Sequence, residues 1–148
     1  MNHAAIVTLD ALKRLRAILE DPKAWVKGNE ALDEKGDRVR YGDQRACSWC
    51  LTGALDLAVK QATEHLNYNP PHPYDIESRA MALLVNHYPI DCTKAYELLS
   101  GANVPAVQHA LMRNEVQHNN DMPDTTHVDI VAWIDEAIAR LTNWMGAA

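Results

Sequence analysis

The chain has 148 residues, and its apolar share of 47% and charged share of 23% are those of an ordinary globular protein, long enough for a single domain over residues 1–148. Its formal charge is −6, and the segment between Asn114 and Ala139 holds six acidic residues and no Lys or Arg. Because nucleic-acid binding needs clustered Lys and Arg, and because no apolar run approaches the ~20 residues that cross a bilayer, we expect neither a nucleic-acid nor a membrane partner.

The first half of the chain is predicted to hold two helices separated by a long connection. Leucines at helical spacing predict a first helix over residues 8–20. Residues 23–45 contain few apolar side chains and three glycines, which predicts a long, partly irregular loop with room for a short hairpin around Val39 and Tyr41. A second helix is predicted over residues 47–66, with one apolar stripe: Cys47, Leu51, Ala54, Leu55, Ala58, Ala62 and Leu66.

Three shorter helices are predicted next. Asp75 can accept hydrogen bonds from the free amides of a helix that begins there and ends before Pro89. A short helix is expected over residues 91–100. Asn103 and Pro105 then open a helix that carries three apolar side chains inward: Val107, Leu111 and Met112.

The last helix has the clearest signals. It follows a polar loop over residues 118–125, and Thr126 with Asp129 forms a capping box in which Asp takes the place of the usual Glu. Its predicted buried face is Ile130, Ile134, Ala137, Ile138, Leu141 and Met145. Six helices of unequal length and no convincing strand pattern predict an all-α, compact single-domain bundle with irregular or orthogonal packing.

Metal and redox chemistry find little support in the sequence. Cys47 and Cys50 form a CxxC motif, but no strand precedes it and Cys92 alone does not complete a zinc site. Several possible metal ligands near the last helix fit no metal motif: His118, Asp121, Asp124, His127 and Asp129. We therefore expect no cofactor and no metal. Three cysteines and a start without signal-peptide features predict a cytoplasmic protein with reduced thiols.

Cys50 is a candidate nucleophile, because the amino end of a helix favours a thiolate. His127 could accept the proton, and Asp121 could orient the His127 ring, as in other Cys-His arrangements. The alternative is that Cys50 is a small core residue and that His127 is a hydrogen-bonded residue at a helix start. The sequence does not show that these residues are close.

Trp25 and Trp49 mark a second candidate site. On a helical wheel Trp49 points away from the apolar stripe, toward the face of Gly53, so another element or a ligand must cover it. Gly inside a helix costs about 1 kcal/mol relative to Ala, which indicates the close approach of another group. The loop over residues 23–45 can fold over this face and bring Trp25 with it. The other interpretation is a small ligand or metal bound near the two indoles.

Two segments of the chain are similar to a known family: Ala46-Cys47-Ser48-Trp49-Cys50-Leu51-Thr52-Gly53-Ala54-Leu55, and Asn120-Asp121 followed by Thr125-Thr126-His127-Val128. With Trp25 and Gly28 they resemble a domain of unknown function in small actinobacterial and phage or prophage proteins. The resemblance covers most of the chain and implies no activity, cofactor or partner. Its pattern positions are Trp25, Gly28, Trp49, Cys50, Gly53, Asn120, Asp121, Thr126 and His127.

From these observations we expect a non-catalytic regulatory or protein-interaction module of the kind that phages or other mobile elements carry. Its acidic carboxy-terminal part would face a basic surface of a partner protein. One alternative is a small hydrolase or transferase that uses Cys50, His127 and Asp121; another is a binder of a small ligand or metal near Trp25 and Trp49. The predicted binding residues are Trp25, Gly28, Trp49, Gly53, Asn120 and Thr126.

A geometric expectation accompanies these hypotheses. The turn from Trp49 to Gly53 and the segment from Asn120 to His127 both mark helix starts with hydrogen-bonding side chains, so we expect them to be neighbours. Asp121 would then accept hydrogen bonds from backbone amides around Gly28 or of the second helix.

Overall fold

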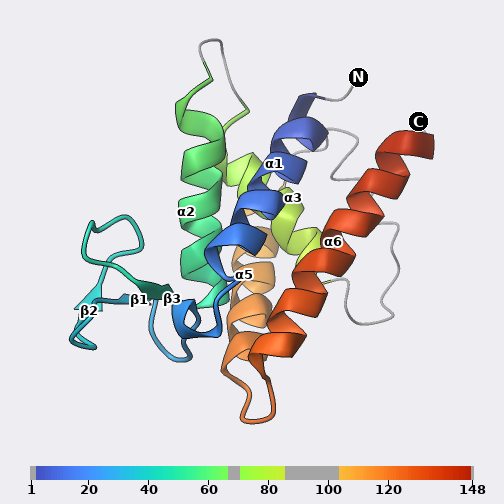
Figure 1. Ribbon diagram of the computed structural model, residues 1–148. Coiled ribbons are helices and arrows are strands. Elements are labelled where there is room, and N and C mark those ends of the chain that lie inside the picture. Colours follow the sequence, from blue (N-terminus) through green and yellow to red (C-terminus); the bar gives the residue numbers. More distant parts are fainter. Residues whose placement is uncertain (1–2, 67–70, 86–103, 148) are drawn as a thin grey trace.

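The computed structural model describes residues 3–66, 71–85 and 104–147 (Figure 1). Within these ranges the chain is mainly helical, as the sequence periodicity predicts. The helices are α1 (His3–Ile18), α2 (Leu51–Glu64), α3 (Pro73–Val85), α5 (Ala106–Asp121) and α6 (His127–Ala147). The helix predicted over residues 91–100, together with Cys92, lies outside the described residues.

A small antiparallel sheet corrects the prediction of an all-α fold. β1 (Ala31–Leu32) pairs on one side with β2 (Arg38–Val39) and on the other with β3 (Ser48–Trp49), in the order β2-β1-β3. The 3-10 helix η1 (Pro22–Ala24) precedes the sheet. Each strand has only two residues. Strands this short give no alternating pattern in the sequence, which is why the prediction allowed only a hairpin.

The predicted start of the second helix was wrong. α2 begins at Leu51, because Cys47 donates its N–H to the carbonyl of Leu32 (2.9 Å) and Ser48 and Trp49 pair with β1. The helical-wheel placement of Trp49 therefore does not apply. Cys47, assigned to the apolar stripe, is exposed.

Other helix ends also differ from the prediction. α1 begins at His3 rather than at residue 8. α3 begins at Pro73, and the ring Nδ1 of His72, not the carboxylate of Asp75, accepts a hydrogen bond from the N–H of Tyr74 (3.2 Å). α5 continues to Asp121, through the first half of the polar loop predicted over residues 118–125. The position of Asn120 on a helix depends on this extension.

The capping box at the start of α6 is confirmed. The N–H of Thr126 donates to Oδ2 of Asp129 (2.8 Å), and the N–H of Asp129 donates to Oγ1 of Thr126 (3.4 Å). Asp therefore replaces Glu in this motif without losing either backbone bond.

The hydrophobic core lies between the helices, with α1 packed against α2, α3 and α6, and α5 packed against α2 and α3 (Figure 1). Two side chains predicted to point inward are instead exposed, Val107 at 72% and Leu111 at 63%, whereas Met112 is buried. The largest fully buried side chains are Leu12, Leu15, Leu19, Leu51, Leu55, Ile76, Met81, Leu83, Ile130, Ile134 and Leu141.

Candidate functional site

Residues 27–49, called the arm below, carry the small sheet away from the helical body on one side of the molecule (Figure 1). The arm lies against the start of α2 at Gly53. A Cβ atom at this position would lie 2.2 Å from the backbone carbonyl oxygen of Glu30. The close approach predicted from Gly53 is therefore confirmed, and the approaching group is the arm backbone. Trp49 is held within the same region, because its Nε1 donates to the carbonyl of Tyr41 (3.0 Å).

Asn120 on α5 joins the two ends of the arm. Its side chain is fully buried, and its Oδ1 accepts hydrogen bonds from Nε1 of Trp25 (2.7 Å) and from the N–H of Leu51 (3.0 Å). Its Nδ2 donates to the carbonyl of Val26 (3.2 Å) and to Oδ1 of Asp121 (2.8 Å). One amide therefore binds the chain just before the arm and just after it. Asn120 and Asp121 are called the latch below.

Asp121 fixes the beginning of the arm. Gly28, whose φ of 76° lies in the left-handed region that favours glycine, donates its N–H to Oδ1 of Asp121 (2.9 Å). Gln117, one turn earlier on α5, donates to Oδ2 (2.8 Å). Burial acts to raise the pKa of Asp121, but the hydrogen bonds from Asn120, Gly28 and Gln117 outweigh it, so the net pKa is lowered.

The latch confirms that the turn from Trp49 to Gly53 and the segment from Asn120 to His127 are neighbours, although Asn120 and Asp121 lie at the end of α5 and not at a helix start. The predicted bond from the loop around Gly28 to Asp121 is confirmed, whereas the amide of the second helix, that of Leu51, is bound by Asn120. Lys27 adds a third link to this region by donating Nζ to the carbonyl of Met122 (2.7 Å).

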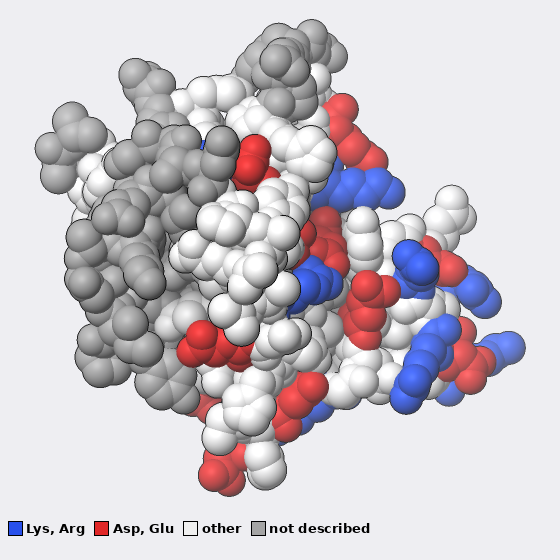
Figure 2. Space-filling model, turned by 180° about the vertical axis from the view of Figure 1, so that it is seen from behind, with Lys and Arg blue, Asp and Glu red and all other residues white. Residues whose placement is uncertain are grey.

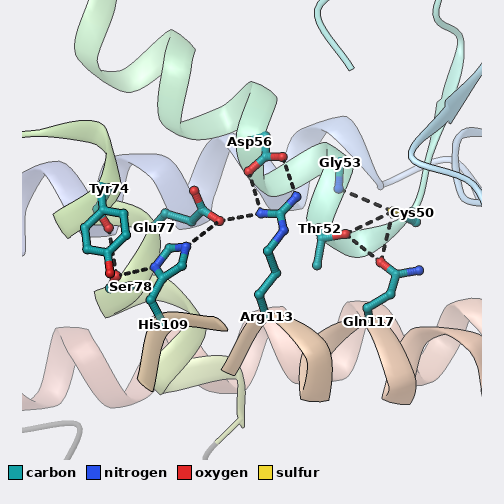
Figure 3. A network of polar contacts seen from close by, with 10 residues as sticks. All are labelled: Cys50, Thr52, Gly53, Asp56, Tyr74, Glu77, Ser78, His109, Arg113 and Gln117. Atoms are coloured by element: carbon teal, nitrogen blue, oxygen red, sulfur yellow. Dashed lines mark hydrogen bonds and ion pairs between the residues drawn. The ribbon is translucent and has the colours of Figure 1, made fainter. Parts of the chain in front are cut away.

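Cys50 is buried, with 1% of its surface exposed, and forms the N-cap of α2 (Figure 3). Its Sγ accepts a hydrogen bond from the N–H of Gly53 (3.3 Å). The same sulfur lies 3.2 Å from Oγ1 of Thr52 and 3.4 Å from Oε1 of Gln117. The thiol therefore has structural partners on α2 and α5 and is covered by them.

His127 has a different set of partners. Its Nε2 lies 2.6 Å from the carbonyl oxygen of Leu19, just after the end of α1. The centroids of the His127 and Trp25 rings are 6.4 Å apart. Asp121 binds Gly28, Asn120 and Gln117 rather than the His127 ring. Among the hydrogen bonds and ring contacts of the described residues, none joins Cys50 to His127. The predicted catalytic residues thus occupy one region without forming a hydrogen-bonded triad.

A second polar cluster lies between α2, α3 and α5 (Figure 3). Arg113 of α5 binds Asp56 of α2 through two parallel bonds, Nη1 to Oδ1 (3.0 Å) and Nη2 to Oδ2 (2.8 Å). Its Nη1 also binds Oε1 of Glu77 on α3. His109, one turn before Arg113, places Nε2 3.6 Å from the same Glu77 oxygen and Nδ1 2.7 Å from Oγ of Ser78. These five residues are called the clamp below.

The charges of the clamp influence each other. Burial raises the pKa of Glu77 to about 7, with repulsion from Asp56 adding to the effect and Arg113 opposing it. Burial, followed by the positive charge of Arg113, lowers the pKa of His109. The hydrogen bond to Asp56 raises the pKa of Arg113, which therefore stays charged.

Sequence reasoning did not identify the clamp. The available signals were the four-residue spacing of His109 and Arg113, which puts both on one face of a helix, and the position of Asp56 outside the apolar stripe of α2. Neither signal indicates that the two faces meet.

Comparison with known proteins identifies the family. Residues 5–140 match the model of a family described as "Family of unknown function (DUF6197)". The chain belongs to this family. No match was found among curated proteins or among solved structures. Membership agrees with the predicted domain of unknown function, and every latch contact of this DUF6197 chain lies within the matched residues.

In the described part of this DUF6197 chain, no three His, Cys, Asp or Glu side chains are grouped closely enough to hold a metal ion. Three of the possible ligands considered above have other partners: Asp121 in the latch, His127 at Leu19 and Asp129 at Thr126. None of the helices within the described ranges is both long and apolar enough to cross a membrane.

Open pockets flank the clamp and the latch in the DUF6197 chain. One, of about 270 Å³, lies beside Cys50 and is lined by residues of the arm, α2 and α5, including Asn29, Thr52 and Gln117. Another, of about 370 Å³, lies between Tyr41, Asp56 and Glu77. Most residues that line these two pockets are polar or charged, whereas typical small-molecule sites are lined mainly by apolar and aromatic residues.

Proposed function

We propose that this DUF6197 protein is a non-catalytic protein-interaction module that contacts its partner through the arm. The observation that carries the proposal is the buried Asn120 side chain, whose bonds hold both ends of the arm on α5. Binding residues are often placed on loops that a rigid body positions. The latch gives the arm that support, since its bonds connect segments 69 to 95 residues apart in the chain.

The surface of the arm suits a polar protein partner. Charged side chains of both signs lie interspersed on it, as Figure 2 shows on the side of the molecule where the arm projects. This mixture fits a partner surface that is itself of mixed charge better than a polyanion. The exposed charged residues of the arm are Glu30, Glu34, Lys35, Asp37, Arg38, Arg40 and Arg45.

The burial of Cys50 supports a non-catalytic role. A cysteine nucleophile needs both a reachable sulfur and a base within hydrogen-bond distance or one bridging water. In this chain the sulfur is covered and caps α2, and His127 binds the carbonyl of Leu19. These contacts support a structural explanation for both residues.

The acidic carboxy-terminal part is a weaker candidate than the arm for the surface that binds the partner. Asp135 forms an ion pair with Arg16 (2.9 Å), and Glu136 forms one with Arg140 (3.4 Å). Asp121 is bound within the latch. A basic partner surface, a regulatory role, a cytoplasmic location and an origin in a phage or other mobile element stay predictions.

Affinity capture tests the role of the arm. The purified wild-type protein and an Arg38→Glu, Arg40→Glu double variant serve as baits in lysate of the source organism. Both arginines are exposed, so reversing them should abolish capture of the partner without unfolding the bait. The matched control reverses two exposed lysines outside the arm, Lys13→Glu with Lys23→Glu, and should capture as the wild type does. A partner captured equally by all three baits would place the interface elsewhere.

A Cys50→Ser variant separates binding from catalysis. Serine is a favoured N-cap residue, so this variant should fold and capture the partner at the wild-type level. Loss of capture from a folded Cys50→Ser protein would show that the thiol has a function beyond capping.

A further inference from the structure

The clamp contains one hydrogen atom whose position the geometry determines. Oγ of Ser78 lies 2.8 Å from the carbonyl oxygen of Tyr74, and the only hydrogen available between them is that of the serine hydroxyl. Ser78 therefore accepts, and Nδ1 of His109, 2.7 Å away, must carry the hydrogen of that second bond. Stacking on Tyr74, with ring centroids 4.1 Å apart, keeps the His109 ring in this orientation.

When the hydrogen of the neutral His109 ring is on Nδ1, no hydrogen lies between Nε2 of His109 and Oε1 of Glu77. A hydrogen bond between these two atoms requires one further proton. A neutral imidazole protonated at Nδ1 has a lone pair at Nε2, and this atom faces Oε1 of Glu77 at 3.6 Å. Lone pair and carboxylate repel each other. A proton on either group turns the contact into an attraction.

Counting charges leads to the same result. The clamp holds two carboxylates, Asp56 and Glu77, and one permanent cation, Arg113. The Asp56 and Glu77 side chains are only 12% and 15% exposed, so water compensates little of the excess negative charge. The cluster becomes neutral when one proton resides on the pair formed by Glu77 and His109.

We propose that the clamp binds one proton near neutral pH and that release of this proton weakens the attachment of α5 to α2 and α3. The position of Arg113 connects this event to the arm, because Gln117 and the latch follow it on the same helix. The proposal concerns the helical body and does not depend on the partner proposed above.

The elements packed around Glu77 carry further charged and titratable groups. From α2, Lys60 and Glu64 share its pocket with Asp56 and pair with each other (3.6 Å). From the arm, Tyr41 lines the same pocket, and from α5 the facing groups are His109 and Arg113. On the other helices packed against α3, Arg140 of α6 reaches the carbonyl of Leu83, while charges of α1 form the pairs Asp10 with Arg14 and Arg16 with Asp135.

The direction in which folding shifts the pKa of Glu77 gives the sign of the pH dependence of the folding equilibrium. Its pKa rises from 4.5 to about 7 on folding, so the folded chain holds the proton more tightly than the unfolded chain between these values. The stabilisation is complete below about pH 4.5 and is lost as the pH rises through about 7. Within this window the folding equilibrium constant falls by up to about tenfold per pH unit.

Carbon-13 NMR titration of the side-chain carboxyl groups tests the proton site directly. In the wild-type protein, one carboxyl should titrate near pH 7, and its signal should be absent from a Glu77→Gln variant. The His109 ring signals should shift over the same range, because coupled groups titrate as a pair. A Glu77 carboxyl that titrates below about pH 5, together with a His109 ring that does not titrate near pH 7, would overturn the proposal, and this result needs no variant that folds.

Amide hydrogen exchange tests the consequence for α5. After correction for intrinsic rates, protection of α5 in the wild type should fall between about pH 5 and pH 7.5. Glutamine keeps an acceptor for Arg113 without titrating, so the Glu77→Gln variant should lose this dependence. Glu64→Gln, which changes an exposed glutamate of the same pocket, should keep it. Equal pH dependence in the Glu77→Gln and Glu64→Gln variants would contradict the proposed role of Glu77.

Discussion

At the scale of single residues, Asn120 shows how a buried amide can be fully satisfied. Its oxygen accepts two hydrogen bonds and its nitrogen donates two, and three of these four partners are the Trp25 indole and the backbones of Val26 and Leu51. A buried polar group without a partner costs about 1–3 kcal/mol. The side chain therefore stabilises the arm mainly by preventing this penalty at both of its ends.

Replacing Asn120 with Ala should be strongly destabilising. Leu51, Val26 and the Trp25 indole would each lose a partner, and we expect the free energy of unfolding to fall by about 3 kcal/mol or more. Urea denaturation followed by circular dichroism measures the change. Asn114→Ala, at an exposed position of the same helix, is the control and should stay within about 0.5 kcal/mol of the wild type. Similar values for the two variants would argue against the latch.

Two glycines in helices should respond oppositely to substitution by Ala. At Gly53 the new Cβ would meet the Glu30 carbonyl oxygen, a backbone atom that cannot rotate away, so we expect a net loss of about 1–3 kcal/mol in the free energy of unfolding. At Gly146 of α6 nothing lies within 4 Å of the new atom. Gly146→Ala should therefore be neutral or stabilise by up to about 1 kcal/mol through helix propensity. Thermal unfolding of both variants checks the contrast.

At the scale of elements, the arm and α5 together cover the start of α2. Cys47 lies exposed on the arm, whereas Cys50, three residues later, lies beneath it against Thr52 and Gln117. The transition from solvent to core thus takes place within a single CxxC motif.

Alkylation of the native protein should distinguish the exposed Cys47 from the buried Cys50. Iodoacetamide should modify Cys47 in the native protein and leave Cys50 unmodified until unfolding, because reaction requires a reachable sulfur. Fragment-ion mass spectrometry of the peptide that contains both cysteines separates the two positions. Opening the latch with Asn120→Ala should speed the modification of Cys50. Rapid native labelling of Cys50 at the rate of Cys47 would revive the nucleophile hypothesis.

Helices were predictable from the sequence to the extent that an apolar stripe defines them. The faces of α2 and α6 follow from regular spacing, since Leu51, Leu55, Ile130 and Ile134 are all buried. Where a side-chain cap or strand pairing determines the local structure, the spacing of apolar residues gives no signal. Trp49 therefore appeared helical although it pairs with Ala31 in a strand.

At the scale of the whole molecule, the candidate site combines residues that spacing cannot connect. The bonds from Asn120 to Trp25 and Leu51 span 95 and 69 residues, and the bonds from Arg113 to Asp56 and Glu77 span 57 and 36. The latch was partly predictable because a pattern of hydrogen-bonding side chains marks both segments that it joins, the turn from Trp49 to Gly53 and the segment from Asn120 to His127. The clamp has no such pattern in the sequence, and only the packing of α2, α3 and α5 brings it together.

The helical body should tolerate removal of the outer arm. Leu32 and Cys47 are joined by a backbone hydrogen bond of 2.9 Å, so a tight Asn-Gly turn can replace residues 33–46. We expect this shortened protein to keep its helical circular dichroism and its latch while losing capture of the partner. Loss of helical structure would show that residues 33–46 are needed for folding as well.

The long span of the latch has a consequence for the order in which the chain matures on the ribosome. The arm and α2 emerge from the exit tunnel well before α5, so Asn120 is still unavailable when Trp25 and Leu51 are already outside. Until α5 arrives, the Trp25 indole and the Leu51 amide lack the Asn120 oxygen that they bind in the folded chain, and the Cys50 thiol lacks its contact with Gln117. The arm is thus among the first segments synthesised and among the last to be anchored.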